Sequence, residues 1–207
     1  GLGDVYKRQT YSIAYKAVLY QGGYDQGFDV SFNVPRGNVR AQANLDEALE
    51  WLAEHGDRRN FLFLHFDDPH QPFNQPAPFD TAFGADPAAL GIELPINIEH
   101  TYIEDPAIRD LSRQLYDGEI AYVDDRIGAF LDALAARGLY EDAAIVFVSD
   151  HGEAMWEHGL FGHGGSKLHD EVIRVPLIVR PGPGDYARGK VVQTQVRAFD
   201  VMPTLLE

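Results

Sequence analysis

A short apolar run followed directly by a dense polar segment is the feature that most constrains the fold. Residues 144–148 (AIVFV) are uncharged and rich in β-branched side chains, which is typical of a strand buried on both faces of a parallel sheet. Asp150 opens a segment of histidines, glycines and acids that runs to Glu171. In open α/β sheets, ligands lie beyond the carboxyl ends of the strands. The sequence therefore predicts a functional site at the end of this strand.

Asp150 and His151 are the candidate ligands of a divalent cation. A carboxylate and a neutral imidazole side by side offer an oxygen and a nitrogen to one ion, provided that the backbone turns after the strand. We expect Gly152 to make that turn, because glycine accepts positive φ angles at little cost. The alternative is a helix-capping aspartate beside a surface histidine, and the histidines, glycines and acids that follow favour the metal.

Five blocks in this part of the chain resemble the second metal-binding segment of the sulfatases, a branch of the alkaline-phosphatase-like metallohydrolases. In order they are VSDHGE (148–153), EHG (157–159), GHG (162–164), LHDE (168–171) and RVPLIV (174–179). Weaker matches are GFD (27–29), PHQPF (69–73), YDGEIAYVDD (116–125) and DVMPTLL (200–206). The resemblance implies an α/β fold with a mostly parallel, doubly wound sheet flanked by helices, incomplete at both ends in this chain.

The same resemblance implies roles for individual residues. Asp150 and His151 would be two of the cation's ligands. His70 would hydrogen-bond the ester oxygens or protonate the leaving alcohol, since the unperturbed pKa of histidine lies near neutrality. His163 stands where many relatives have a lysine that contacts the sulfate and the nucleophile, and Lys167 is a second candidate for that positive charge. The alternative for His70 and His163 is that both are ordinary loop histidines.

A carboxylate-rich ligand shell favours Ca²⁺, with Mg²⁺ or Mn²⁺ as alternatives, over a zinc site built from histidines. By resemblance, two more aspartate ligands and a formylglycine nucleophile would lie upstream of Gly1. We therefore expect the chain to be a fragment of the N-terminal catalytic domain that is inactive by itself.

The resemblance implies hydrolysis of sulfuric esters, with a sulfated small molecule or glycan as substrate. One alternative is a phosphoric ester or phosphonate hydrolase, or a phosphoglycerol transferase, of the same superfamily. Another is a non-catalytic, cation-binding scaffold. The formal charge of −15 argues against nucleic acid as a partner, and no run is long enough to span a membrane. The sequence leaves the oligomeric state and the compartment open, and a periplasmic or secreted location is compatible with it.

We expect the chain to divide into a non-native or disordered leader (1–10) and the central and later part of the catalytic domain (11–207), with a loop insertion at about 74–107. Within that loop, Asn97, His100 and Tyr102 could contact the alcohol portion of the substrate. Periodicity and glycine positions predict helices at 11–20, 41–52 and 116–134, strands at 61–66 and 175–179, and a helix that begins at Asp200 or Thr204. We expect Asp67 and Asp68 to be solvated or capping residues, and acids such as Glu119 to lie on a solvated helix face.

Overall fold

The computed structural model describes residues 9–15, 28–34, 41–96, 98, 105–164, 168–184, 186 and 188–206. The chain forms two compact units, Gly1–Arg137 and Gly138–Glu207. Both contain helices and strands, as expected of an α/β protein. In the residues described, no helix is both long and apolar enough to cross a membrane.

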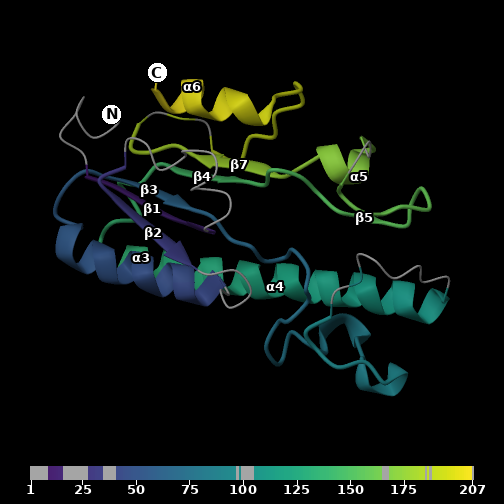
Figure 1. The fold of residues 1–207 in the computed structure, drawn as a ribbon. Coiled ribbons are helices and arrows are strands. Elements are labelled where there is room, and N and C mark those ends of the chain that lie inside the picture. The colour runs from purple at the N-terminus through teal and green to yellow at the C-terminus, as the bar shows by residue number, and fades with distance from the viewer. Residues whose placement is uncertain are drawn as a thin grey trace. The chain divides into compact units, whose positions relative to one another are not determined.

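The sheet of the first unit is parallel. Its central strand is β1 (Gln9–Tyr15), which pairs with β2 (Val30–Val34) on one edge and with β3 (Asn60–Leu64) on the other (Figure 1). Ile13 of β1 is the Cα partner of Phe32 and of Leu64. This parallel pairing agrees with the predicted sheet, and β3 matches the strand expected at 61–66.

The helix predicted at 11–20 is wrong over residues 11–15, which form most of β1. Thr10, Tyr11 and Ile13 are β-branched or aromatic, and backbone pairing along both edges of β1 outweighs a weak helical periodicity. Residues 9 and 10 of the predicted leader belong to the same strand. The rest of that leader and residues 16–20 lie outside the described part of the chain.

Helix α3 (Ala41–His55) confirms the helix expected from residue 41. Its apolar stripe is buried, with Ala41, Leu45 and Ala48 at most 3% exposed. The backbone N–H of Ala41 donates to Asp68 Oδ2 at 2.9 Å. Asp68 thus satisfies one of the N–H groups that a helix start leaves without an intrahelical acceptor, which is the capping role expected of it.

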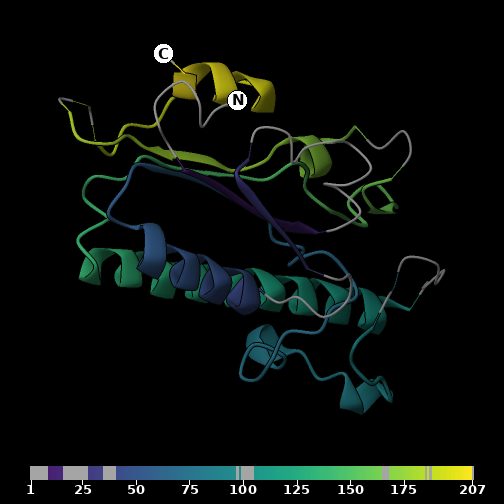
Figure 2. The ribbon, with the colours of Figure 1, turned by 60° about the vertical axis from the view of Figure 1, so that its left-hand side comes forward.

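Helix α4 (Pro106–Ala136) lies beside α3 (Figures 1 and 2) and begins well before the predicted start at Tyr116. Asp105 caps it, accepting the N–H of Ala107 at 2.9 Å, and Pro106 is the first helical residue. Proline suits that position because its missing N–H would have no helical partner there. The predicted end holds, since Gly138 follows with φ at 70°.

The segment after β3 packs against α4. It contains two short 3₁₀ turns, η1 (Ala82–Gly84) and η2 (Ala88–Leu90). Asn74 N–H donates to Glu119 Oε1 at 2.6 Å, and Gln75 Nε2 donates to Leu115 O at 2.9 Å. Glu119 is therefore buried, only 3% exposed, and the prediction that it lies on a solvated face is wrong. Asn97, His100 and Tyr102 lie outside the described residues.

The second unit contains two small antiparallel pairs. Strand β4 (Ile145–Val148) pairs with β7 (Leu177–Arg180), and β5 (Ala154–Met155) pairs with β6 (Phe161–Gly162). Its helical elements are α5 (Asp170–Ile173), η3 (Ala198–Asp200) and α6 (Val201–Leu206). β4 and β7 match two predicted strands. However, β4 is not buried on both faces, because Phe147 is 38% and Val148 40% exposed, and among the residues described β4 pairs with β7 alone.

The packing on α4 predicts opposite effects for two glycine substitutions in that helix. A Cβ on Gly118 would lie 2.5 Å from the backbone oxygen of Phe79, whereas no described atom comes within 4 Å of one on Gly128. We expect Gly128→Ala to raise the free energy of unfolding by up to about 1 kcal/mol through helix propensity. Gly118→Ala should lower it by about 1–3 kcal/mol through overpacking. Urea denaturation measures both, and equal stabilisation by the two would contradict this packing.

Candidate functional site

Asp150 and His151 lie directly after β4 with their side chains close together. The His151 N–H donates to Asp150 Oδ1 at 2.9 Å, and His151 Nδ1 lies 2.9 Å from the carbonyl oxygen of Gly152. Because a carbonyl only accepts, the proton of a neutral ring sits on Nδ1 and the lone pair on Nε2. That Nε2 lies 3.7 Å from Asp150 Oδ2. The two predicted ligands thus direct a nitrogen and an oxygen toward a common point.

Gly152 is required here for a reason other than the predicted one, since its φ is not among the positive values. Its N–H donates to Val172 O in α5 at 2.7 Å. A Cβ on Gly152 would overlap the backbone oxygen of Glu171. The residue is therefore a glycine because the backbone of α5 passes directly against it, and this contact fixes the chain that follows Asp150 and His151.

The structure also brings His163 to this place. Its ring stacks on that of His151, with centroids 3.9 Å apart and planes at 27°. His163 Nδ1 lies 3.1 and 3.2 Å from the two carboxylate oxygens of Glu153, whose side chain is only 8% exposed. Glu153 therefore orients His163, a partnership that the sequence did not specify. Lys167 lies outside the described residues.

His70 belongs to the first unit, where it follows β3. Its N–H donates to Asp67 O at 2.7 Å, and its Nδ1 lies 2.5 Å from Gln71 O. The same reasoning assigns the ring proton to Nδ1, because the carbonyl can only accept. Its predicted role at the ester stays a prediction.

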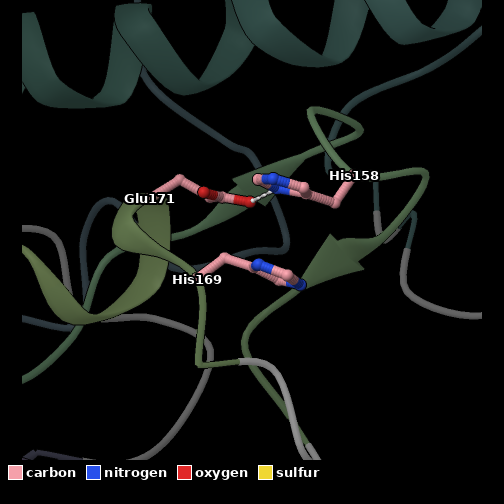
Figure 3. Close-up of side chains that lie close together, drawn as sticks. All are labelled: His158, His169 and Glu171. Carbon is pink, nitrogen blue, oxygen red and sulfur yellow. Dashed lines mark hydrogen bonds and ion pairs between the residues drawn. The ribbon is translucent and has the colours of Figure 1, made fainter.

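A second group of side chains that could hold a metal ion consists of His158, His169 and Glu171 (Figure 3). The two imidazole rings stack with centroids 3.9 Å apart and planes at 8°. His158 Nδ1 lies 2.6 Å from Glu171 Oε1. The backbone N–H of Glu171 and this contact with His158 hold the pKa of the Glu171 carboxyl below its ordinary value. No role was predicted for His169, which stands in the LHDE block two residues before Glu171.

Comparison with known proteins decides the family. The model of the sulfatase family matches residues 1–207. The chain belongs to the sulfatase family.

Two curated relatives and one solved structure illustrate the similarity. The multifunctional alkaline phosphatase superfamily protein PehA of Trinickia caryophylli is 29% identical, over 78% of this chain and 36% of its own length. An arylsulfatase of Clostridium perfringens is also 29% identical, over 79% of this chain and 37% of its own. The phosphonate monoester hydrolase of Agrobacterium radiobacter has a TM-score of 0.55 and 28% identity, covering 66% of this chain and 32% of that one. The chain spans little more than a third of the length of these two curated relatives.

The contact between Gly152 and α5 can be tested with a matched pair of variants. Gly152→Ala should lower the free energy of unfolding by about 1–3 kcal/mol, because a methyl group cannot share the space of the Glu171 backbone. Gly164→Ala in the same segment should change it by less than about 0.5 kcal/mol, since no described atom lies within 4 Å of the added carbon. Thermal denaturation of both variants measures the difference. Equal stability of the two would contradict the close approach of α5.

Proposed function

We propose that the protein to which this chain belongs hydrolyses sulfuric esters with one divalent cation, held in part by Asp150 and His151. The observation that carries the proposal is the 3.7 Å between Asp150 Oδ2 and His151 Nε2, with the His151 proton held on the far nitrogen by Gly152 O. The donors are a carboxylate oxygen and an imidazole lone pair, which together suit a divalent metal. The substrate would be a sulfated small molecule or glycan.

The separation of the two donors favours calcium. Calcium binds its ligands at about 2.3–2.6 Å. With the two donor atoms 3.7 Å apart, the donor–calcium–donor angle would be about 90–110°, close to that between neighbouring ligands in a calcium site. Mg²⁺, with ligands at about 2.0–2.1 Å, would need an angle of about 125–135° rather than the octahedral 90°. In the complete protein, two further aspartates and a formylglycine nucleophile would complete the site. The bound cation would polarise an ester oxygen and help the nucleophile to ionise.

Two histidines of this chain would act on the ester itself. Glu153 holds the Nδ1 edge of His163. We therefore propose that Nε2 of His163 hydrogen-bonds the sulfate. In many relatives a lysine makes that contact. In His70, Nδ1 faces Gln71 O, so Nε2 is the nitrogen that would hydrogen-bond the ester or protonate the leaving alcohol. Lys167 remains a second candidate for the positive charge near the sulfate.

A second candidate function is hydrolysis of phosphoric esters or phosphonates at the same site. It is favoured by the similarity to the phosphonate monoester hydrolase and to PehA, whose name describes it as multifunctional. A phosphoryl group presents the same anionic oxygens to a cation and to imidazole donors, so the residues described here suit both classes of ester.

The assignment of the metal ligand predicts unequal effects for two neighbouring acids. In the complete protein, Asp150→Ala should lower kcat/KM by more than about 100-fold and weaken Ca²⁺ binding, since it removes a ligand. Glu153→Ala should cost about 10–100-fold and leave Ca²⁺ affinity nearly unchanged, the scale typical of a supporting residue. Steady-state kinetics and calcium titration measure both. Similar losses of Ca²⁺ affinity in the two variants would count against Asp150 as the ligand.

The function itself is tested by substrate class. Purified complete protein, loaded with Ca²⁺, should hydrolyse an aryl sulfate with a higher kcat/KM than the matching aryl phosphate or aryl phosphonate monoester. The Asp150→Ala variant serves as the control for contaminating hydrolases. A higher kcat/KM for the phosphorus esters would favour phosphoric ester or phosphonate hydrolysis over sulfuric ester hydrolysis. No turnover of any of them, with Ca²⁺ bound, would support the non-catalytic scaffold instead.

A further inference from the structure

We propose that His158, His169 and Glu171 form a second metal site, which binds a zinc ion and is distinct from the Asp150 and His151 pair. Four of the eight histidines of the chain lie in this part of the sequence, at positions 151, 158, 163 and 169. They form two stacked pairs, His151 with His163 and His158 with His169. Only the second pair belongs to a group of three convergent ligand atoms within the described residues.

The donor chemistry selects the ion. Two imidazoles and one carboxylate are a ligand set that zinc takes readily, with the fourth position left to water. Hard cations such as Ca²⁺ and Mg²⁺ prefer shells made mostly of oxygen. The site of His158, His169 and Glu171 would therefore prefer zinc, whereas the site of Asp150 and His151, completed by further aspartates, would prefer calcium.

The geometry requires the His158 side chain to rotate out of its stack on His169. One ligand atom from each residue lies within 4.8 Å of the others. Zinc with ligands at about 2.0–2.1 Å in a tetrahedral arrangement needs them about 3.3–3.4 Å apart. The His158 side chain is 51% exposed, so it can turn out of the stack with little loss of packing. Binding would exchange its hydrogen bond to Glu171 for coordination by both residues.

The backbone that carries two of the ligands is already fixed. His169 O accepts the N–H groups of Val172 at 2.9 Å and Ile173 at 3.1 Å, and Val172 is only 5% exposed. His169 and Glu171 are therefore delivered by one ordered turn, at the start of α5, and His158 by the turn that joins β5 to β6 (Figure 3). A bound ion would tie these two turns together, next to the backbone that contacts Gly152.

The test is a zinc titration of the complete protein, stripped of metal, in the presence of excess Ca²⁺. A chromophoric chelator that competes for zinc reports how much zinc the protein binds. The wild type should bind at least one equivalent of Zn²⁺ that calcium does not displace. His158→Gln and His169→Gln should each lose one equivalent, or weaken it by more than about tenfold. His163→Gln and His55→Gln are the matched controls, and both should retain it. Co²⁺ in place of Zn²⁺ should give the visible absorption of a four-coordinate site, and His158→Gln should abolish that absorption.

Two results would overturn the proposal: equal zinc content in the wild type and the His158→Gln variant, or loss of the same equivalent in His163→Gln. The exposed side chain of His158 makes its variant the one best able to fold, and circular dichroism checks this. Because the readout is bound metal and not turnover, the result is independent of which ester the protein hydrolyses.

Discussion

The close passage of the α5 backbone against Gly152 is the constraint on which the candidate site depends. The hydrogen bond from Gly152 N–H to Val172 O joins the end of β4 to a segment twenty residues further along the chain. It holds Gly152 in place, and the carbonyl oxygen of Gly152 accepts the Nδ1 proton of His151, which leaves Nε2 of that ring facing Asp150. The same turn of α5 carries Glu171 to His158. One backbone contact therefore positions both groups of candidate metal ligands.

The charge of the chain bears on the proposed substrate. An anionic ester needs positive charge or hydrogen-bond donors around it, yet the chain as a whole carries a formal charge of −15. Where many sulfatases have a lysine, this chain has His163, and a histidine is not permanently charged near neutral pH as a lysine is. The carboxylate of Glu153, whose side chain is only 8% exposed, lies 3.1 Å from Nδ1 of His163 and holds that edge of the ring. Under the proposed function, Glu153 and His163 would act as a pair.

The sequence predicted those features that depend on local pattern. The stripe of α3 follows from periodicity and the end of α4 from Gly138. Features that depend on distant neighbours were missed. β1 looked helical until its two strand partners were known, and Glu119 looked solvated until the loop that covers it was placed. The group of His158, His169 and Glu171 could not be assembled from spacing, because a hairpin and a separate helical turn meet to form it.

Anomalous diffraction can show whether Asp150 and His151 together hold a divalent cation. Crystals of the complete protein would be grown with Mn²⁺ as a reporter that calcium can displace. We expect an anomalous peak within about 2.1–2.6 Å of both an Asp150 carboxylate oxygen and His151 Nε2. This peak should disappear when excess Ca²⁺ is added. Side chains of Asp150 and His151 that point apart, with no peak between them, would contradict it.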